Sequence, residues 1–201
     1  MEEILFSKEN APFDSASFLE KAKLSPEDIS SIEMETRGQS SNWKWARYRK
    51  FRLTASNFGF VIKAMKRNSY PKSLFTRLEG SKDLSKIKQI QWGLHNEKAG
   101  VSVSEKTLNV SESGLWLESS GLLGASPVGF FRNQDGSTSI LEVKCPFKYR
   151  EDNLNEKLKL VKDYILHIND DVYVINNTHD YYHQMQGQLA ISNAKSCSFG
   201  L

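Results

Sequence analysis

The chain has 201 residues, of which 39% are hydrophobic and 25% are charged. This composition is that of a globular domain with a substantial core, and it excludes a disordered or fibrous chain. No apolar run reaches the roughly 20 residues that a membrane-spanning helix needs, so we expect no membrane partner. The acidic start Met1–Ile4 does not resemble a secretory signal, and Cys145 and Cys197 are too few for a disulfide framework. We therefore expect an intracellular protein, either cytoplasmic or nuclear.

The net charge of +3 conceals a segregation of charge along the chain. The segment 36–78 contains eleven Lys and Arg residues and no Asp or Glu. The other 16 basic residues oppose all 24 acidic residues, which gives the rest of the chain a charge of −8. A basic stretch on an otherwise acidic domain favours a polyanionic partner such as DNA. The alternatives are a solvated basic surface and a domain that contacts only proteins.

Residues 1–40 predict a helical lead-in whose first dozen residues are flexible. Within it, Ser25 precedes Pro26, and two acids follow in the first turn, which is the pattern of a helix start. The remainder, 41–201, is expected to form one domain.

The segment 43–52 alternates cations with aromatic residues. Such alternation suits DNA, because cations contact phosphates and rings stack on bases. It also fits an amphipathic helix with buried rings. Directly afterwards, Thr54 or Ser56 can cap a helix whose apolar residues recur at helical spacing, namely Phe58, Val61, Ile62 and Met65. A hydroxyl cap beside arginines predicts a phosphate seat, and a plain helix cap would use the same residues.

Residues 82–108 predict a helix with an apolar stripe formed by Ile87, Ile90 and Leu94. Glu97 lies at the edge of this stripe. It is either a carboxylate that reaches inward towards a site or an ordinary surface acid.

From residue 110 the apolar period becomes that of strands. The segments 110–118 and 121–131 predict a strand pair, and Asp135-Gly136 predicts the turn of the next hairpin. That hairpin would bring residue 128 close to Glu142.

The strand 139–144 carries Glu142 and Lys144 on one face, because residues i and i+2 of a strand point the same way. Leu141 and Val143 face the core, and the following Pro146 ends the strand. A carboxylate beside an ammonium suits metal-assisted phosphodiester hydrolysis, since the carboxylate binds a hard cation and the lysine orients water or neutralises charge. The alternative is a solvated ion pair.

The segment 148–162 predicts a helix, 170–175 is a strand or an extended loop, and 178–193 predicts a helix. In the last of these, Tyr181, Gln184 and Gln188 share one face. A stripe of amides with a tyrosine suits either solvent or the floor of an active site.

Taken in order, these segments resemble the lambda-exonuclease/YqaJ-like viral recombinase family of PD-(D/E)XK nucleases over about residues 40–195. The motifs that carry the resemblance are Arg49 or Arg52 with Leu53-Thr54-Ala55-Ser56, the helix Gly93-Leu94-His95-Asn96-Glu97, the strand Gly124-Ala125-Ser126-Pro127-Val128-Gly129, the strand Glu142-Val143-Lys144-Cys145-Pro146, and Tyr181-x-x-Gln184. The resemblance implies an α/β, restriction-endonuclease-like core, with a central mixed β-sheet flanked by helices. The nuclease domain would span 41–201, with its C-terminal strand truncated.

The resemblance implies DNA as the partner and Mg²⁺ or Mn²⁺ as the cofactor, no small-molecule cofactor, and an oligomer as one option. The implied catalytic residues are Glu97, Glu142, Lys144 and Gln184. The implied DNA- and phosphate-binding residues are Arg49, Arg52, Thr54, Ser56 and Tyr181. The implied metal ligands are Glu142, Glu97 and the backbone carbonyl of Cys145.

One position departs from the family, which places a metal-binding aspartate where this chain has Val128. Valine offers no oxygen to a hard cation, and Asp135 lies in a turn from which we do not expect it to substitute. Losing a coordinating carboxylate should weaken metal binding by on the order of several kcal/mol. We therefore expect an impaired metal-dependent DNA exonuclease or, alternatively, a catalytically inactive DNA-binding module derived from one.

Overall fold

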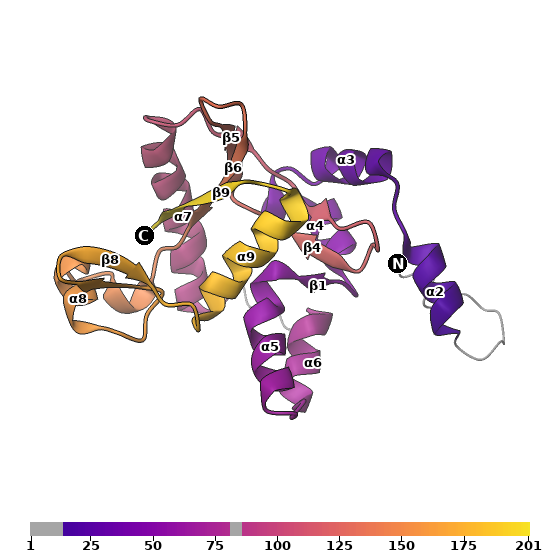
Figure 1. The fold of residues 1–201 in the computed structure, drawn as a ribbon, viewed down its shortest axis with the longest axis horizontal. Coiled ribbons are helices and arrows are strands. Elements are labelled where there is room, and N and C mark those ends of the chain that lie inside the picture. Colours follow the sequence, from indigo (N-terminus) through magenta and orange to yellow (C-terminus); the bar gives the residue numbers. More distant parts are fainter. Residues whose placement is uncertain (1–13, 81–85) are drawn as a thin grey trace.

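The structure is a computed structural model that describes residues 14–80 and 86–201 (Figure 1). The predicted flexible first dozen residues and part of the start of the helix predicted over 82–108 lie outside these ranges. In the described residues, no helix is long and apolar enough to cross a bilayer.

A four-stranded mixed sheet contains the strand with Glu142 and Lys144. The strands lie in the order β2-β5-β6-β9, with β6 antiparallel to β5 and parallel to β9. Their bounds are β2 (Ser111–Glu112), β5 (Gly129–Arg132), β6 (Thr138–Val143) and β9 (Ser196–Gly200). The predicted turn joins β5 to β6, and Gly136 adopts the left-handed conformation there (φ 79°). The prediction of a mixed sheet flanked by helices is confirmed.

The strand pair predicted over 110–131 is divided between two sheets. β3 (Trp116–Leu117) pairs with β4 (Leu123–Ala125), and β1 (Leu53–Thr54) adds to β4 in parallel. The flanking segments instead form the β2–β5 pair of the mixed sheet. A separate hairpin joins β7 (Leu166–Asn169) to β8 (Val172–Ile175), so part of the ambiguous segment 170–175 is a strand.

The α-helices are α2 (Ser15–Ala22), α3 (Pro26–Glu35), α4 (Trp43–Arg49), α5 (Phe58–Lys66), α6 (Lys72–Glu79), α7 (Lys88–Glu105), α8 (Leu154–Leu160) and α9 (Asp180–Ser192). Short 3₁₀ helices are η1 (Gln39–Ser41), η2 (Ala55–Asn57) and η3 (Phe147–Tyr149). The helix predicted over 148–162 is therefore shorter than expected, because η3 and a turn precede α8.

Helix α9 lies centrally, between η2 and α5 on one side and strands β4 and β6 on the other (Figure 1). Two glycines permit this close packing. A Cβ atom at Gly187 would lie 2.6 Å from the ring of Phe58, and one at Gly59 would lie 2.3 Å from the carboxylate of Asp180. The fold thus holds α9 directly against the strands that carry the site.

Helix α3 begins at the predicted cap, where Ser25 and Asp28 form a reciprocal capping box around Pro26. Its buried Ile32 packs with Leu115 and Leu117. Polar anchors add to this contact, because Glu33 Oε1 accepts from Gly114 N at 2.9 Å and Thr36 Oγ1 accepts from Leu115 N at 2.7 Å. Buried hydrogen bonds therefore join the end of α3 to the segment that leads into β3.

The apolar stripe of the helix predicted over 82–108 is largely exposed. Ile87, which caps α7, is 40% exposed, Leu94 is 47% exposed, and no residue of α7 is buried. The helix approaches the sheet through a glycine, and a Cβ atom at Gly100 would lie 2.6 Å from Val143. After α9 the chain forms β9, which pairs in parallel with β6.

Replacing Thr36 by valine should lower the free energy of unfolding by about 1–3 kcal/mol, because the buried amide of Leu115 would lose its acceptor. The matched control is Thr107→Val, since the exposed Thr107 hydroxyl donates only to Ser104 O within its own helix end. Urea denaturation of both variants measures the difference. Equal midpoints for the two variants would contradict the anchoring role of Thr36.

Candidate functional site

Glu142 lies in β6 and Lys144 follows the strand directly, and their side chains lie together, as the spacing of two residues predicts. Leu141 and Val143 are buried on the other face, at 1% and 3% exposure. The Lys144 ammonium forms a short ion pair with Oε1 of Glu142, and the Glu142 side chain is only 2% exposed. The strand ends at Val143, one residue before the predicted end, and Pro146 caps η3.

Helix α9 supplies two further donors to the same carboxylate. Gln184 Nε2 donates to Glu142 Oε1 at 2.7 Å, and Gln188 Nε2 donates to Glu142 Oε2 at 2.8 Å. The two amides lie one helical turn apart, so both face β6. The predicted polar stripe of α9 is therefore a buried floor beneath Glu142.

A cleft of about 890 Å³ opens beside this cluster. It brings together most of the residues that the sequence singles out, although they lie far apart in the chain. The predicted residues that line it are Arg49, Ser56, Glu97, Val128, Glu142, Lys144 and Gln184.

The other predicted site residues lie around the cleft. Arg52 is only 7% exposed, and its guanidinium donates to Gly121 O at 2.7 Å and to Tyr48 O, so it fixes the backbone between α4 and β4. Tyr181 faces the Lys144 ammonium, which lies 5.2 Å from its ring centroid. The Cys145 side chain is half-buried, and burial raises the pKa of its thiol.

The predicted hydroxyl cap of α5 is wrong. The residue that caps α5 is Asn57, without a side-chain hydrogen bond, because Thr54 lies in β1 and Ser56 lies within η2. The Thr54 hydroxyl instead lies 3.2 Å from that of Ser56 and accepts from Arg49 Nη2 at 3.4 Å. The hydroxyls thus form a cluster with Arg49 rather than a helix cap.

Arg49 is held in place by Trp45, whose ring centroid lies 4.1 Å from the guanidinium carbon. Burial lowers the pKa of Arg49 to about 10, so the group stays cationic at neutral pH. The indole of Trp45 also donates to Ser126 Oγ at 2.8 Å. A fixed cation and the hydroxyls of Ser56 and Ser126 therefore meet at the wall of the cleft.

Burial and charge act in opposite directions on the ionisable groups of the cleft. Burial raises the pKa of Glu97, the nearby Lys144 opposes this effect, and Glu142 adds to it. For Lys144, burial alone would lower the pKa, but attraction to Glu142 and their hydrogen bond outweigh it and raise the pKa. Lys144 is therefore an ammonium at neutral pH and acts as a donor rather than as a base.

The donors around Glu142 do not fit the divalent metal that the resemblance implies. Both carboxylate oxygens already accept hydrogen bonds from the protein, and Val128 supplies no oxygen to the cleft. Across residues 14–80 and 86–201, no three His, Cys, Asp or Glu side chains are grouped to hold a metal ion. Asp135 cannot compensate, because it lies at the β5–β6 turn and pairs with Lys195 at 2.6 Å.

The structure adds residues that the sequence did not assign to the site. The sequence placed Gln188 on the same helix face as Gln184, but it did not identify Glu142 as the group that Gln188 binds. No sequence pattern indicated a role for Gln39, because its partners lie far away in the chain. Its amide donates to Pro127 O at 2.7 Å, across 88 residues, and to Ser113 O at 3.0 Å. Its backbone is left-handed (φ 44°), which only the folded loop reveals. Gln39 thereby fixes the segment that presents Val128.

A mixed sheet whose inner strand pairs an acid with a lysine, above the amides of a packed helix, defines an α/β protein of nuclease-like architecture. Residues 44–195 match the YqaJ-like viral recombinase domain, and the chain belongs to that family. The resemblance drawn from the motifs is thus confirmed.

Known relatives agree with this assignment. The chain is 32% identical over 182 residues to the alkaline nuclease of Orgyia pseudotsugata multicapsid polyhedrosis virus, which covers 84% of this chain. It is 29% identical over 185 residues to the alkaline nuclease of Autographa californica nuclear polyhedrosis virus, which covers 83% of this chain. In both comparisons the chain spans 42% of the relative's length.

Solved structures agree as well. The alkaline exonuclease LHK-Exo of Laribacter hongkongensis matches with a TM-score of 0.53 and 25% identity, over 78% of this chain and 71% of that chain. The SOX protein in a SOX–DNA complex matches with a TM-score of 0.56 over 92% of this chain and 60% of that chain. At 15% identity, the second likeness shows the fold alone.

Replacing Glu97 by glutamine should stabilise the protein at pH 8. Because burial raises the pKa of Glu97 in the folded protein, ionising this carboxyl costs stability above that pKa, and glutamine removes the cost. Below the ordinary value of 4.5 the carboxyl is protonated in both states, so the gain should vanish at low pH.

Urea midpoints at pH 8 and pH 4 measure this effect. The control is Glu105→Gln, which removes the same charge from an exposed position on the same helix. A Glu97→Gln variant that is less stable than the native chain at pH 8 would show that the carboxylate is stabilising instead.

Proposed function

We propose that the chain binds DNA in the cleft around Glu142 and that its metal-dependent phosphodiester hydrolysis is severely impaired. The observation that supports the proposal is the set of hydrogen bonds that the Glu142 carboxylate accepts. Its two oxygens are taken by Lys144, Gln184 and Gln188, and Val128 stands where the family has an acid. Mg²⁺ or Mn²⁺ is the cation that the resemblance implies, and Glu97 and Glu142 are the side chains that would hold it.

DNA as the partner is supported by the charge of the cleft wall. Helix α4, η2 and α5 belong to the acid-free segment 36–78, and Arg49 of α4 lines the cleft. A positively charged wall with hydroxyl donors suits phosphate oxygens. Among the matched structures, LHK-Exo is described in complex with dAMP and SOX in complex with DNA, which supports nucleic acid as the ligand here.

Lys144 has a definite role in such a complex. Its ammonium faces both Glu142 and the ring of Tyr181, and it remains 20% exposed towards the cleft. A protonated amine in this position can donate to a phosphate oxygen without leaving Glu142, because an ammonium has three protons. The ion pair thus holds the cation ready for an anionic ligand.

An active metal-dependent exonuclease is the second candidate. It is favoured by one observation, namely that Glu97, Glu142, Lys144 and Gln184 all line a single cleft. For this candidate, Glu142 would have to exchange protein donors for a cation. Since the chain spans only 42% of the alkaline nucleases that it matches, their activity is a proposal for this chain.

The variant Val128→Asp tests whether cleavage is lost at this position. With Mn²⁺ or Mg²⁺ and linear duplex DNA, we expect no cleavage by the native chain and detectable cleavage by Val128→Asp, because the new carboxylate restores a ligand beside Glu142. A second change, Glu142→Ala, should abolish the gained activity. The matched control for an added charge is Val172→Asp, at an exposed position of β8. Cleavage by the native chain that is lost in Glu142→Ala would instead establish the active nuclease.

The variant Arg49→Gln tests the binding part of the proposal separately. We expect severalfold weaker duplex binding and a salt dependence reduced by about 0.9 in slope, as for the loss of one phosphate contact. The control is Arg150→Gln, since Arg150 also lies over an aromatic ring, Phe147 at 4.0 Å, but does not line the cleft. Fluorescence anisotropy from low to moderate salt measures both. A native affinity that is independent of salt would argue against phosphate contacts.

A further inference from the structure

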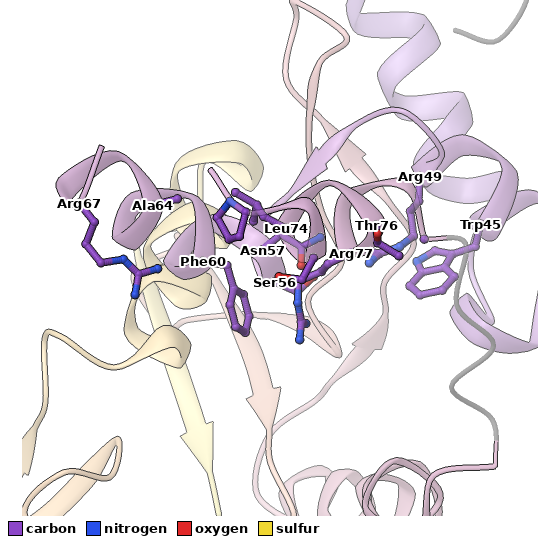
Figure 2. A pocket seen from close by; sticks show the side chains of 13 residues that line it. Trp45, Arg49, Ser56, Asn57, Phe60, Ala64, Arg67, Leu74, Thr76 and Arg77 are labelled. Atoms are coloured by element: carbon purple, nitrogen blue, oxygen red, sulfur yellow. The ribbon is translucent and has the colours of Figure 1, made fainter. Parts of the chain in front are cut away.

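A second cavity, of about 700 Å³, adjoins the cleft. It is formed by α4, η2, α5 and α6, and it shares three residues with the cleft, namely Trp45, Arg49 and Ser56. Figure 2 shows its labelled side chains in a row, with Arg67 at one end and Trp45 and Arg49 at the other. We call this cavity the arginine groove. It therefore extends from the wall of the cleft.

The lining of the arginine groove is cationic. Arg49, Arg67 and Arg77 line it, and no Asp or Glu among the described residues does. The groove is also lined by the hydroxyls of Ser56, Ser73 and Thr76 and by the amide of Asn57. Within the described part of the chain, no carboxylate pairs with Arg67 or Arg77. An acid-free cavity with three guanidinium groups selects for an anion with several charges.

Two of the three arginines that line the groove stack on aromatic rings. The Arg77 guanidinium lies 4.0 Å from the centroid of Phe60, and Arg49 lies 4.1 Å from that of Trp45. Stacking restrains a guanidinium while leaving its N–H edge free to bind a phosphate. Phe60 is half-buried and, like Arg77, faces the middle of the groove (Figure 2).

We propose that the arginine groove binds a single strand of DNA that continues from the cleft. Arg67 and Arg77 would contact successive phosphates, and the ring of Phe60 would pack against a base. Cations that track a backbone beside aromatic rings are the usual means of binding single strands without sequence preference. A volume of about 700 Å³ suits a few nucleotides and is too small for a double helix. This inference rests on the proposed function, because the strand enters through the DNA-binding cleft.

The test uses the full chain and two labelled probes, a 5′-phosphorylated single strand of about 12 thymidines and a blunt duplex of similar length. The variants are the double change Arg67→Gln with Arg77→Gln, and Phe60→Leu, which keeps an apolar side chain. The matched control is Arg150→Gln, since Arg150 stacks on Phe147 at the same 4.0 Å distance outside the groove. Circular dichroism confirms that each variant is folded.

We expect the double variant to bind the single strand about tenfold more weakly, with a salt slope reduced by about 1.4, as for two lost contacts at 0.7 each. Phe60→Leu should weaken single-strand binding about fivefold. Duplex binding should change less than twofold in both variants, and Arg150→Gln should match the native chain.

Unchanged single-strand affinity in the double variant would overturn the inference, and so would an equal loss for duplex and single strand. In either case the native chain still binds DNA, so the proposed function would stand. A native chain that binds neither probe would instead refute the proposed function itself.

Discussion

The buried carboxylate of Glu142 is the group on which the rest of the structure depends. A carboxylate at 2% exposure is costly unless its charge and lone pairs are satisfied, and here Lys144, Gln184 and Gln188 satisfy them. Two of these donors come from α9, so this helix must lie close against β6. Gly59 and Gly187 permit the matching approach of α5 and η2 from the other side. The same network thus fixes the position of the central helix and defines the floor of the cleft.

This network also affects which ligands the cleft can bind. Where an acid-rich site would attract a cation, the ammonium of Lys144 already neutralises Glu142 from within the protein. The Val128 side chain adds no charge, and burial, with a smaller effect of Glu142, raises the pKa of Glu97. The cations that line the cleft are Arg49, Lys98 and Lys144, and we expect an anionic ligand to bind beside them rather than beside Glu97, Glu105 and Glu112. On the proposed function, DNA would bind without rearranging this network, whereas a metal ion would reach Glu142 by displacing one of its hydrogen-bond donors.

The sequence predicted the parts of the site that depend on local geometry. Strand alternation placed Glu142 beside Lys144, and helical spacing placed Gln184 beside Gln188, because both rules hold within one element. It could not separate Arg49 from Arg52, which differ only in that the second is buried against the backbone of Gly121. Long-range contacts were equally hidden. No local rule shows that Thr54 pairs in β1 and precedes η2 without a capping hydrogen bond from its side chain.

The basic residues that are close together in the sequence also form one surface of the folded protein, because the helices that carry them are neighbours in space. Helices α4 and α5 and most of α6 belong to the acid-free segment 36–78, and with η2 these helices form the arginine groove. Of these elements, α4 and η2 also line one wall of the cleft, through Trp45, Arg49 and Ser56. The acids that line the cleft, Glu97, Glu105, Glu112 and Glu142, all come from later in the chain. The cleft thus has a basic wall and an acidic wall. We expect a polyanion in the cleft to lie nearer the basic wall. Arg49, Trp45 and Ser56 line both the cleft and the arginine groove, so the basic wall continues into the groove at these residues. Under the proposal for the arginine groove, a single strand that leaves the cleft at this point would lie beside Phe60 and Arg77.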